Sequence, residues 1–586
     1  MKITTLPKSS FMTRFTSNEH AIMAVLAAIV GTIGGFGAIA FRLLIDLVQT
    51  LAYGAKGNLL ELALASPWYV KLLVPAGGGL LVGPLVYFFA REAKGHGVPE
   101  VMEAIALRRG IIRKRVVFIK SIASALCIGT GGSVGREGPI VQIGSAIGSS
   151  LGQILKVSGD RIRTLVGCGA AAGIAATFNA PIAGSMFALE IILGDFALTT
   201  FSPIVISAVA ATAISRHFLG NNPAFFVPPY NLISAWELPM YIVLGLFCGA
   251  VALGFTTILY RIEDLFDSIK FPEYLKAVFG GIIIGLISLV FPHILGVGYP
   301  AIDLALFQQL SMWALLLLVA LKIIATSITI GSGGSGGIFA PSLFMGAMAG
   351  GFFGAVVHQI FPDITAPPGA YSIVGMGAVV AGTTHGPITA ILILFEMTGE
   401  YLIILPLMSA CIISSLFARQ LLPDSIYTLK LARRGVNLQS GKEVNILRSI
   451  PVSDIMNQDI DTIYEGLPLG ELSQKIINSK HNSFPVVDAE QKLTGILSYF
   501  DYQDVFSDEN LKDLIVAKDL ATPNVVTVSL HDDLYTALQK ISSKDYSILP
   551  VVENEDSSSH LVGLITRRDI ISAYDKAVIK QSIKPK

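Results

Sequence analysis

The sequence predicts an all-α polytopic membrane domain built from two repeated halves, followed by a cytosolic α/β domain. Three observations lead to this fold class. Hydrophobic residues make up 52% of the 586 positions and charged residues only 14%, about half the charged fraction of soluble domains. The apolar runs end near residue 422, and ordinary soluble sequence begins after residue 440. Landmarks rich in Gly and Pro recur about 200 residues apart within the apolar part.

Several apolar runs approach the length of about 20 residues that spans a bilayer: residues 21–48, 70–90, 237–258, 275–291, 312–330 and 402–418. Other runs are short and interrupted by Gly and Pro, so we expect broken helices beside the straight ones. The expected organisation is a cytosolic N-terminal segment at 1–14, a membrane domain at 15–440 with repeats at about 20–220 and 235–420, and a tail at 447–580.

Charged residues predict the orientation of the membrane domain. The segment 1–14 is polar and mildly basic, and the clusters at 108–109 and 113–115 should share its cytosolic side, because cytosolic loops carry an excess of Lys and Arg. The 42 basic and 42 acidic residues balance, so nothing suggests a nucleic-acid partner. The four cysteines stand inside apolar segments without paired or metal-ligand spacing, which indicates small buried residues rather than disulfides, and no metal site is expected.

Three landmarks occur twice in the same order. The first is Gly-x-Gly-x-Pro, the second is a Gly-rich stretch that ends in Pro, and the third is Pro-Ile with a glutamate nine residues after the proline. In the two halves they lie at Gly95–Pro99 and Gly296–Pro300, at Gly131–Pro139 and Gly333–Pro341, and at Asn179–Ile182 with Glu190 and His385–Ile388 with Glu396.

Repeated halves with interrupted helices at matching places are typical of transporters whose site lies at the bilayer midplane. If each half has an odd number of passes, the two halves are inverted. A broken helix can aim its unsatisfied N-terminal amides at the centre, where they and the helix dipole favour an anion. Glycine lets the backbone approach the ion closely. The alternative is that these glycines only allow helices to pack closely.

The tail is a second repeat, this time of a soluble module. Short β-branched runs alternate with amphipathic stretches at 469–478 and 533–543, a pattern that indicates an α/β fold. The matching pieces are Asp454–Met456 and Asp519–Ala521, each 31 residues ahead of Pro485–Val487 and Pro550–Val552, and then Gly495–Asp501 and Gly563–Asp569.

At this point the sequence resembles the CLC family of chloride channels and transporters over about 20–580, with a tandem CBS domain as its tail. Gly135–Pro139 is similar to the family's gating-glutamate motif, Gly337–Pro341 to its Gly-x-Phe-x-Pro motif, and Ile426–Leu429 to the segment of its pore tyrosine. The resemblance implies the CLC fold of two inverted repeats, in a homodimer with one anion pathway per subunit. It also implies CBS repeats at about 452–508 and 516–577, and it implies transport rather than an enzyme.

Carried over residue by residue, the resemblance implies an anion site and a gate. Chloride would be held by the backbone amides of Ile338 and Phe339 and the hydroxyl of Tyr427. Amides near Arg136 and Glu137 would form an outer site. An ionised Glu137 at a helix N-terminus can occupy an anion site itself and leave it when protonated. The alternative is a glutamate that only satisfies helix-end amides. Arg136 would stabilise the outer anion or pair with Glu137.

Two residues depart from the family pattern. His96 stands where chloride-selective relatives carry Ser, so anion binding through an imidazole N–H is retained while selectivity becomes open, and a structural histidine turned away from the ion is the alternative. Ile191 stands where proton-coupled exchangers carry an internal glutamate, and an aliphatic side chain cannot relay a proton. Channel-like or loosely proton-coupled transport is therefore expected, with a strictly coupled Cl⁻/H⁺ antiporter as the alternative if water or Glu190 replaces the relay.

The remaining acidic residues and the tail complete these expectations. Glu190 and Glu396 are expected to cap helices or contact a dimer partner before they serve transport. A divalent-cation channel is disfavoured because few acids occur in the apolar part.

In CBS pairs, the Gly-h-h-(Ser/Thr)-x-x-Asp pattern, where h is hydrophobic, binds the ribose of ATP or another adenine nucleotide. The chain carries it as Ser498 with Asp501 and Thr566 with Asp569, while a CBS pair that only steadies the membrane domain is the alternative. The expected location is the cell inner or plasma membrane.

Overall fold

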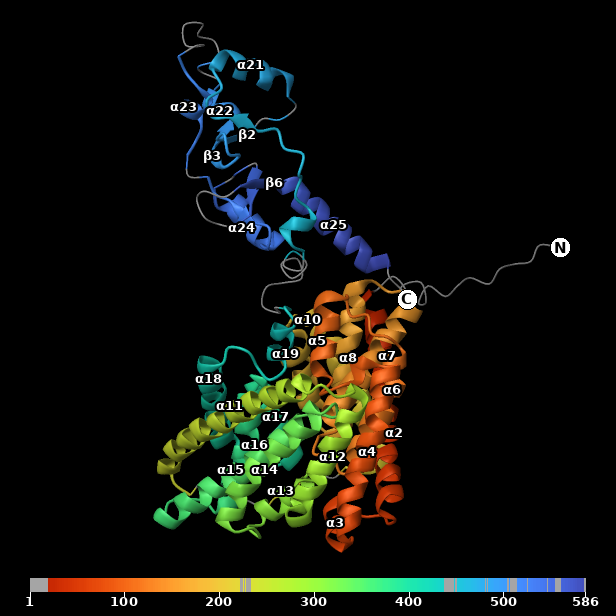
Figure 1. Cartoon of the computed structure of the whole chain (residues 1–586). Helices are drawn as coiled ribbons and strands as arrows, with labels where there is room; N and C mark the ends of the chain where they lie inside the picture. Colours follow the sequence, from red (N-terminus) through yellow and green to blue (C-terminus); the bar gives the residue numbers. More distant parts are fainter. Residues whose placement is uncertain are drawn as a thin grey trace, which may run out of the picture. The chain divides into compact units, whose positions relative to one another are not determined.

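The fold was analysed in a computed structural model, which describes residues 19–221, 225, 227, 233–436, 447, 450–479, 481, 483–502, 505, 514–523, 525–544, 546, 548–553 and 560–583. The expected cytosolic segment 1–14 lies outside the described residues. The chain separates into two compact units, Met1–Arg434 and Gly435–Lys586 (Figure 1). The first unit is helical, and the second combines helices with two small sheets.

In the described part of the first unit, the main helices form two sets of eight that follow one another in the same order. The first set is α2 (Glu19–Tyr53), α4 (Trp68–Phe89), α5 (Val98–Leu107), α6 (Arg115–Gly129), α7 (Glu137–Ile154), α8 (Gly159–Phe178), α9 (Pro181–Met186) and α10 (Leu198–Leu219). The second set is α11 (Leu238–Ser268), α12 (Glu273–Val290), α13 (Tyr299–Leu306), α14 (Met312–Gly331), α15 (Phe339–Ile360), α16 (Pro368–Thr384), α17 (Pro387–Thr398) and α18 (Ile404–Leu421). Two short helices, α3 (Leu59–Ala65) and α19 (Thr428–Arg433), stand outside this correspondence.

Shorter turns join the main helices. Three-residue 3₁₀ turns lie at Arg91–Ala93, Ala235–Glu237, Pro292–Ile294 and Val452–Asp454, and a π-helical segment at Phe187–Leu193 continues α9.

Matching helices pack in matching ways. Helix α7 packs on α8 as α15 packs on α16, and α2 packs on α10 as α11 packs on α18, while α4 and α12 join the two sets. Glycines allow the closest of these contacts: a Cβ on Gly144 of α7 would collide with the carbonyl of Gly169 in α8, and Gly346 and Gly375 make the same contact between α15 and α16. For these helical glycines, close packing is therefore the role that the structure displays.

Among the described residues, eight helices are long and apolar enough to cross a membrane: α2, α4, α10, α11, α12, α14, α15 and α18. Helix α15 is the most enclosed of them, and its neighbour α16 is buried along its whole length. Helix α4 runs through Pro75 and Pro84 without interruption, which neighbouring helices permit inside a membrane bundle.

The second unit contains two copies of one three-stranded arrangement. One sheet has the order β1 (Ile463–Tyr464), β2 (Ser483–Val487), β3 (Leu493–Ser498), and the other β4 (Val528–Ser529), β5 (Ile548–Val552), β6 (Leu561–Thr566). In each sheet the first pair is parallel and the second antiparallel. The helices are α21 (Leu469–Asn478), α22 (Tyr499–Tyr502), α23 (Ala517–Leu520), α24 (Leu534–Lys544) and α25 (Arg567–Ile583).

The two copies exchange backbone bonds at their edges. Asn457, ahead of the first sheet, forms an antiparallel bridge with Leu564 of β6, and Thr522, ahead of the second sheet, does the same with Ile496 of β3. Each copy thus completes the sheet of the other, so the pair forms one folding unit.

Candidate functional site

The two Gly-rich stretches meet where α7 and α15 begin. Gly135 and Gly337 exchange two backbone hydrogen bonds, of 2.7 and 2.6 Å, in an antiparallel bridge. The two chain segments therefore run in opposite directions at their contact, as a two-fold relation between the halves requires. Neither helix has a side-chain cap at its N-cap residue, Arg136 in α7 and Ile338 in α15. Uncapped N-terminal amides are donors suited to an anion.

The two Gly-x-Gly-x-Pro loops lie beside this junction. Their glycines adopt positive φ angles, 78° at Gly95 and 85° at Gly97, with 59° at Gly296 and 90° at Gly298, so residues with a Cβ would be strained there. Each loop is tied to the Gly-rich stretch of the other half: the Gly95 amide donates to Gly334, and the Gly296 amide donates to Gly131.

A buried lysine holds each of these loops. Lys120 donates to the carbonyls of Ala93 and Gly95 at 3.0 and 2.8 Å. Lys322, its counterpart in the second half, donates to Ile294 and Gly296 at 2.9 and 3.0 Å. Both side chains are fully enclosed, so the paired carbonyls compensate part of the cost of burying the amine.

His96 lies in the first loop against Tyr427. Its side chain is 0% exposed, and neither ring nitrogen has a hydrogen-bond partner among the described residues. Its ring centre is 5.9 Å from that of Tyr427, the residue just ahead of α19. The first loop and Tyr427 therefore meet in the interior of the protein. The amides of Ile338 and Phe339, the expected anion ligands, are at the start of α15.

Glu137 begins α7 and is 1% exposed. Its Oε1 accepts a 2.7 Å hydrogen bond from the hydroxyl of Tyr299. Its Oε2 has no hydrogen-bond partner among the described residues, and a Cβ placed on Gly135 would meet both this oxygen and Ala340 of α15. The carboxylate therefore lies between the starts of the two helices.

Arg136 does not form a salt bridge with Glu137 in the described part of the chain. Its guanidinium lies over the ring of Tyr299, 5.4 Å from the ring centre, and its buried Nε has no hydrogen-bond partner among the described residues. At least this N–H group of Arg136 is therefore without an acceptor in the described part of the chain.

Glu190 and Glu396 cap helices across the repeat boundary. Glu190 accepts from the amides of Ile388 and Thr389 at the start of α17, at 3.2 and 2.7 Å. Glu396 accepts from Ile182 and Ala183 at the start of α9, at 3.1 and 2.7 Å. Each half therefore caps the short broken helix of the other. The capping role expected for these glutamates is what the structure displays.

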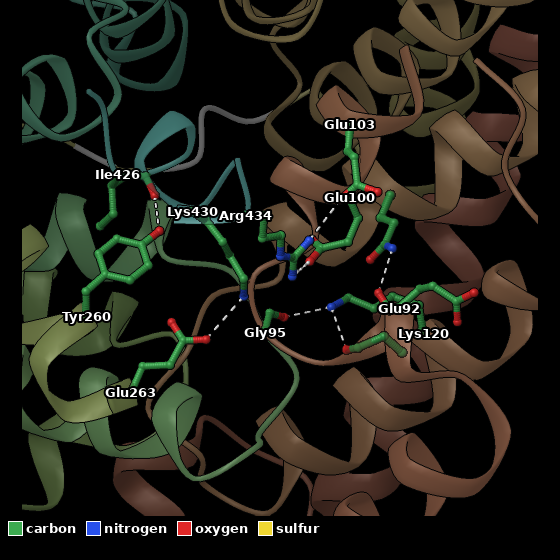
Figure 2. Close-up of polar contacts among 12 residues, drawn as sticks. Glu92, Gly95, Glu100, Glu103, Lys120, Tyr260, Glu263, Ile426, Lys430 and Arg434 are labelled. Atoms are coloured by element: carbon green, nitrogen blue, oxygen red, sulfur yellow. Dashed lines mark hydrogen bonds and ion pairs between the residues drawn. The ribbon is translucent and has the colours of Figure 1, made fainter. Parts of the chain in front are cut away.

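A cluster of charged residues, which sequence reasoning missed, surrounds the Gly95 loop and α19 (Figure 2). Lys430 of α19 lies 3.5 Å from Glu263 of α11, and both side chains are largely buried. Arg434 forms salt bridges with Glu100 and Glu103 of α5 at 3.3 and 3.0 Å. A sequence feature that could have indicated this cluster is the position of Lys430, one helical turn after Tyr427.

A cavity of about 270 Å³ opens on this charged cluster. It is lined by Arg91, Lys94, Tyr260, Glu263, Asp264, Asp267, Lys430, Arg433 and Arg434. The Tyr260 hydroxyl donates to the carbonyl of Ile426, which precedes Tyr427, at 2.5 Å. The cavity wall is therefore hydrogen-bonded to the segment that carries Tyr427. No group of His, Cys, Asp and Glu residues suited to a metal occurs in the described ranges.

Comparison with known proteins decides the family. The family model described as voltage gated chloride channel matches residues 78–419, more than half of the chain. The chain belongs to this chloride channel family. The CBS domain model matches twice in the tail, at 452–508 and 517–576. The predicted membership of the CLC family, with a mostly helical membrane fold and two CBS repeats, is confirmed.

Curated relatives and solved structures agree with this assignment. The chain is 37% identical over 415 residues to a ClcB-like protein of Ralstonia nicotianae, covering 70% of this chain and 97% of that protein. It is 32% identical over 419 residues to the H(+)/Cl(-) exchange transporter ClcA of Yersinia pestis, covering 70% and 87%. A slow cyanobacterial Cl-/H+ antiporter structure matches with a TM-score of 0.64 and 30% identity, over 70% of this chain and 97% of that one. The chain is thus a multi-pass membrane protein of a family that transports anions and comprises no enzymes.

Proposed function

We propose that this CLC protein moves chloride, or a similar small monovalent anion, along a pathway gated by Glu137. The observation that carries the proposal is the meeting of two uncapped helix N-termini, α7 and α15, around one buried carboxylate. Helix N-termini attract anions through their free amides and the positive end of the dipole. A negatively charged side chain among them occupies the place that a transported anion would take.

The inner anion would be bound by the amides of Ile338 and Phe339, the hydroxyl of Tyr427 and an N–H of His96. Neither His96 nitrogen has a hydrogen-bond partner among the described residues, which supports this assignment, because a buried imidazole without a hydrogen bond is costly and an anion would supply the acceptor. The outer anion would lie at the amides near Glu137, with the Nε–H of Arg136, which has no hydrogen-bond partner among the described residues, beside it.

Gating would follow from the protonation of Glu137. The ionised carboxylate competes with the outer anion, whereas the neutral form loses its attraction to the helix ends and leaves the site. Proteoliposomes test this directly. Glu137→Gln is expected to give chloride flux that no longer depends on pH, and Tyr427→Phe is expected to weaken chloride binding. Flux and binding unchanged by both substitutions would contradict the proposal.

Transport would be channel-like or loosely coupled to protons. Ile191 is buried and apolar, and its side chain packs on Gly386, while Glu190 uses both carboxylate oxygens to cap α17. Neither side chain is placed to pass a proton freely. Strict Cl⁻/H⁺ antiport is the second candidate, favoured by the names of the ClcA and cyanobacterial relatives. A chloride gradient imposed on vesicles distinguishes the two: uphill proton movement would establish antiport.

The CBS pair would bind an adenine nucleotide and regulate flux. In each repeat, one aspartate oxygen accepts from a backbone amide and a hydroxyl: Asp501 from Ser498 and Asp569 from Thr566. Their other oxygens make no hydrogen bond within the described residues, so they remain available to the hydroxyls of a ribose. ATP titration during flux measurements tests the regulation.

Assembly and orientation are further parts of the proposal. Exposed apolar side chains at Leu405, Met408, Ile412 and Leu416 form a stripe along α18, which suits a lipid or a second subunit of a homodimer. Single-molecule counting in liposomes tests the dimer.

The N-terminal segment and the CBS tail would lie in the cytosol, on the same side as the basic positions 108–109 and 113–115, because cytosolic loops carry an excess of Lys and Arg. The protein would lie in the cell inner or plasma membrane.

A further inference from the structure

The second Gly-x-Gly-x-Pro loop carries an aromatic residue, Tyr299, just before its proline. None of the family motifs named above includes this residue. Tyr299 follows Gly298 and begins α13; its counterpart in the first loop is Val98. In the first loop His96 approaches Tyr427, whereas in the second loop Tyr299 approaches Glu137. The two loops therefore present different chemistry to the two anion positions.

The position of Tyr299 is set from several sides. Gly298, at a φ of 90°, turns the chain ahead of it, and Lys322 holds the carbonyl of Gly296 in the same loop. The Tyr299 ring packs edge-on against Phe225, with 5.3 Å between ring centres. The guanidinium of Arg136 covers the ring. These contacts hold the Tyr299 ring with its hydroxyl directed at Glu137.

The charged and titratable side chains that face Glu137 come from three places: Arg136 at the start of α7, Tyr299 at the start of α13 and Tyr427 ahead of α19. Behind them, Arg42 of α2 interacts with Arg136 and Tyr299. Of these, only the Tyr299 hydroxyl makes a side-chain hydrogen bond to the carboxylate among the described residues. A phenol donor bonds an ionised carboxylate more strongly than a neutral one.

We propose that Tyr299 is a latch on the gate: a positioning residue whose hydroxyl holds ionised Glu137 between the starts of α7 and α15. The inference rests on the proposed gating role of Glu137 and adds the group that sets the pH at which the gate opens. Loss of the hydroxyl removes support from the ionised form alone, so the gate opens at higher pH.

The test is chloride efflux from proteoliposomes over a series of pH values. Tyr299→Phe removes the hydroxyl and keeps the ring. We expect the pH of half-maximal flux to rise by about one unit or more, since a hydrogen bond to a charged group contributes about that much. If Tyr299→Phe folds poorly, Tyr299→Met, which also lacks the hydroxyl, should show the same rise in the pH of half-maximal flux. In a Glu137→Gln background, Tyr299→Phe should have no further effect.

Tyr241→Phe is the matched control. It removes a hydroxyl that donates to another glutamate, Glu237, at 3.2 Å, and it should leave the midpoint unchanged. The outcomes separate the two proposals. A midpoint unmoved by Tyr299→Phe, together with flux made independent of pH by Glu137→Gln, would overturn the latch and leave the gate. A pH dependence that survives Glu137→Gln would overturn the gate itself.

Discussion

At the residue scale, His96 is a buried imidazole whose two nitrogens have no hydrogen-bond partner among the described residues. The side chains of Lys430, Lys120 and Arg434 also interact with it electrostatically. Burial and the three neighbouring basic side chains are unfavourable to a protonated histidine. The inner site is therefore expected to use neutral His96 as a donor.

Replacement of His96 tests this role. His96→Leu removes the donor at similar bulk and is expected to weaken chloride binding about tenfold or more, the loss of one hydrogen bond to a charged group. His96→Ser should retain binding because it keeps a hydroxyl donor. Isothermal titration calorimetry measures both. Chloride affinity of the Leu variant equal to that of the wild type would assign His96 a structural role.

The buried lysines offer a comparison between the halves. Lys120→Met and Lys322→Met each leave two carbonyls unpaired, and each is expected to lower the free energy of unfolding by about 1–3 kcal/mol. Thermal unfolding in detergent measures this loss. Only Lys120→Met should also weaken chloride binding, because its loop carries His96. An equal effect of both variants on chloride binding would contradict the expectation that only the loop with His96 contributes to it.

At the element scale, the broken helices depend on caps supplied by the opposite half. Glu190→Ala and Glu396→Ala each expose two amides at a helix N-terminus, and each is expected to lower stability by about 0.5–2 kcal/mol. Unfolding midpoints in detergent give the stability, and vesicle pH gives the coupling. Loss of proton movement in Glu190→Ala without loss of stability would instead identify Glu190 as a proton relay.

Much of the helical framework could be predicted, because long apolar runs have few alternatives in a membrane. The run at 312–330 became α14 (Met312–Gly331), and that at 275–291 became α12 (Glu273–Val290). The amphipathic stretch 469–478 became α21. The run at 70–90 likewise became α4 (Trp68–Phe89), which stays continuous through its two prolines while packed against α12.

The site was predictable where a motif repeats, or where a segment resembles one of the family's, as at Ile426–Leu429. Gly95, Gly135 and Gly337 are visible in the sequence because their backbone conformations or close contacts require glycine. Tyr299 and Glu263 stand far in sequence from the groups that they contact, Glu137 and Lys430. No local pattern marks such pairs, since the contact exists only after the two halves have packed together.

At the scale of the whole molecule, the tail is expected to act as one nucleotide-binding unit, because each CBS copy completes the sheet of the other. Asp501→Ala with Asp569→Ala should abolish ATP binding and any effect of ATP on flux, while basal chloride flux persists. Calorimetry and flux assays measure the two effects. A wild-type protein whose flux is indifferent to ATP at every concentration would reduce the tail to a structural support.

The central claim is that an anion and the Glu137 carboxylate compete for the amides where α7 and α15 begin. Anomalous X-ray diffraction from Glu137→Gln crystals grown in bromide tests it most directly. The account predicts one bromide peak near the amides of Ile338 and Phe339 and another at the position vacated by the ionised carboxylate. Bromide peaks only at the protein surface, with none between the two helix starts, would contradict it.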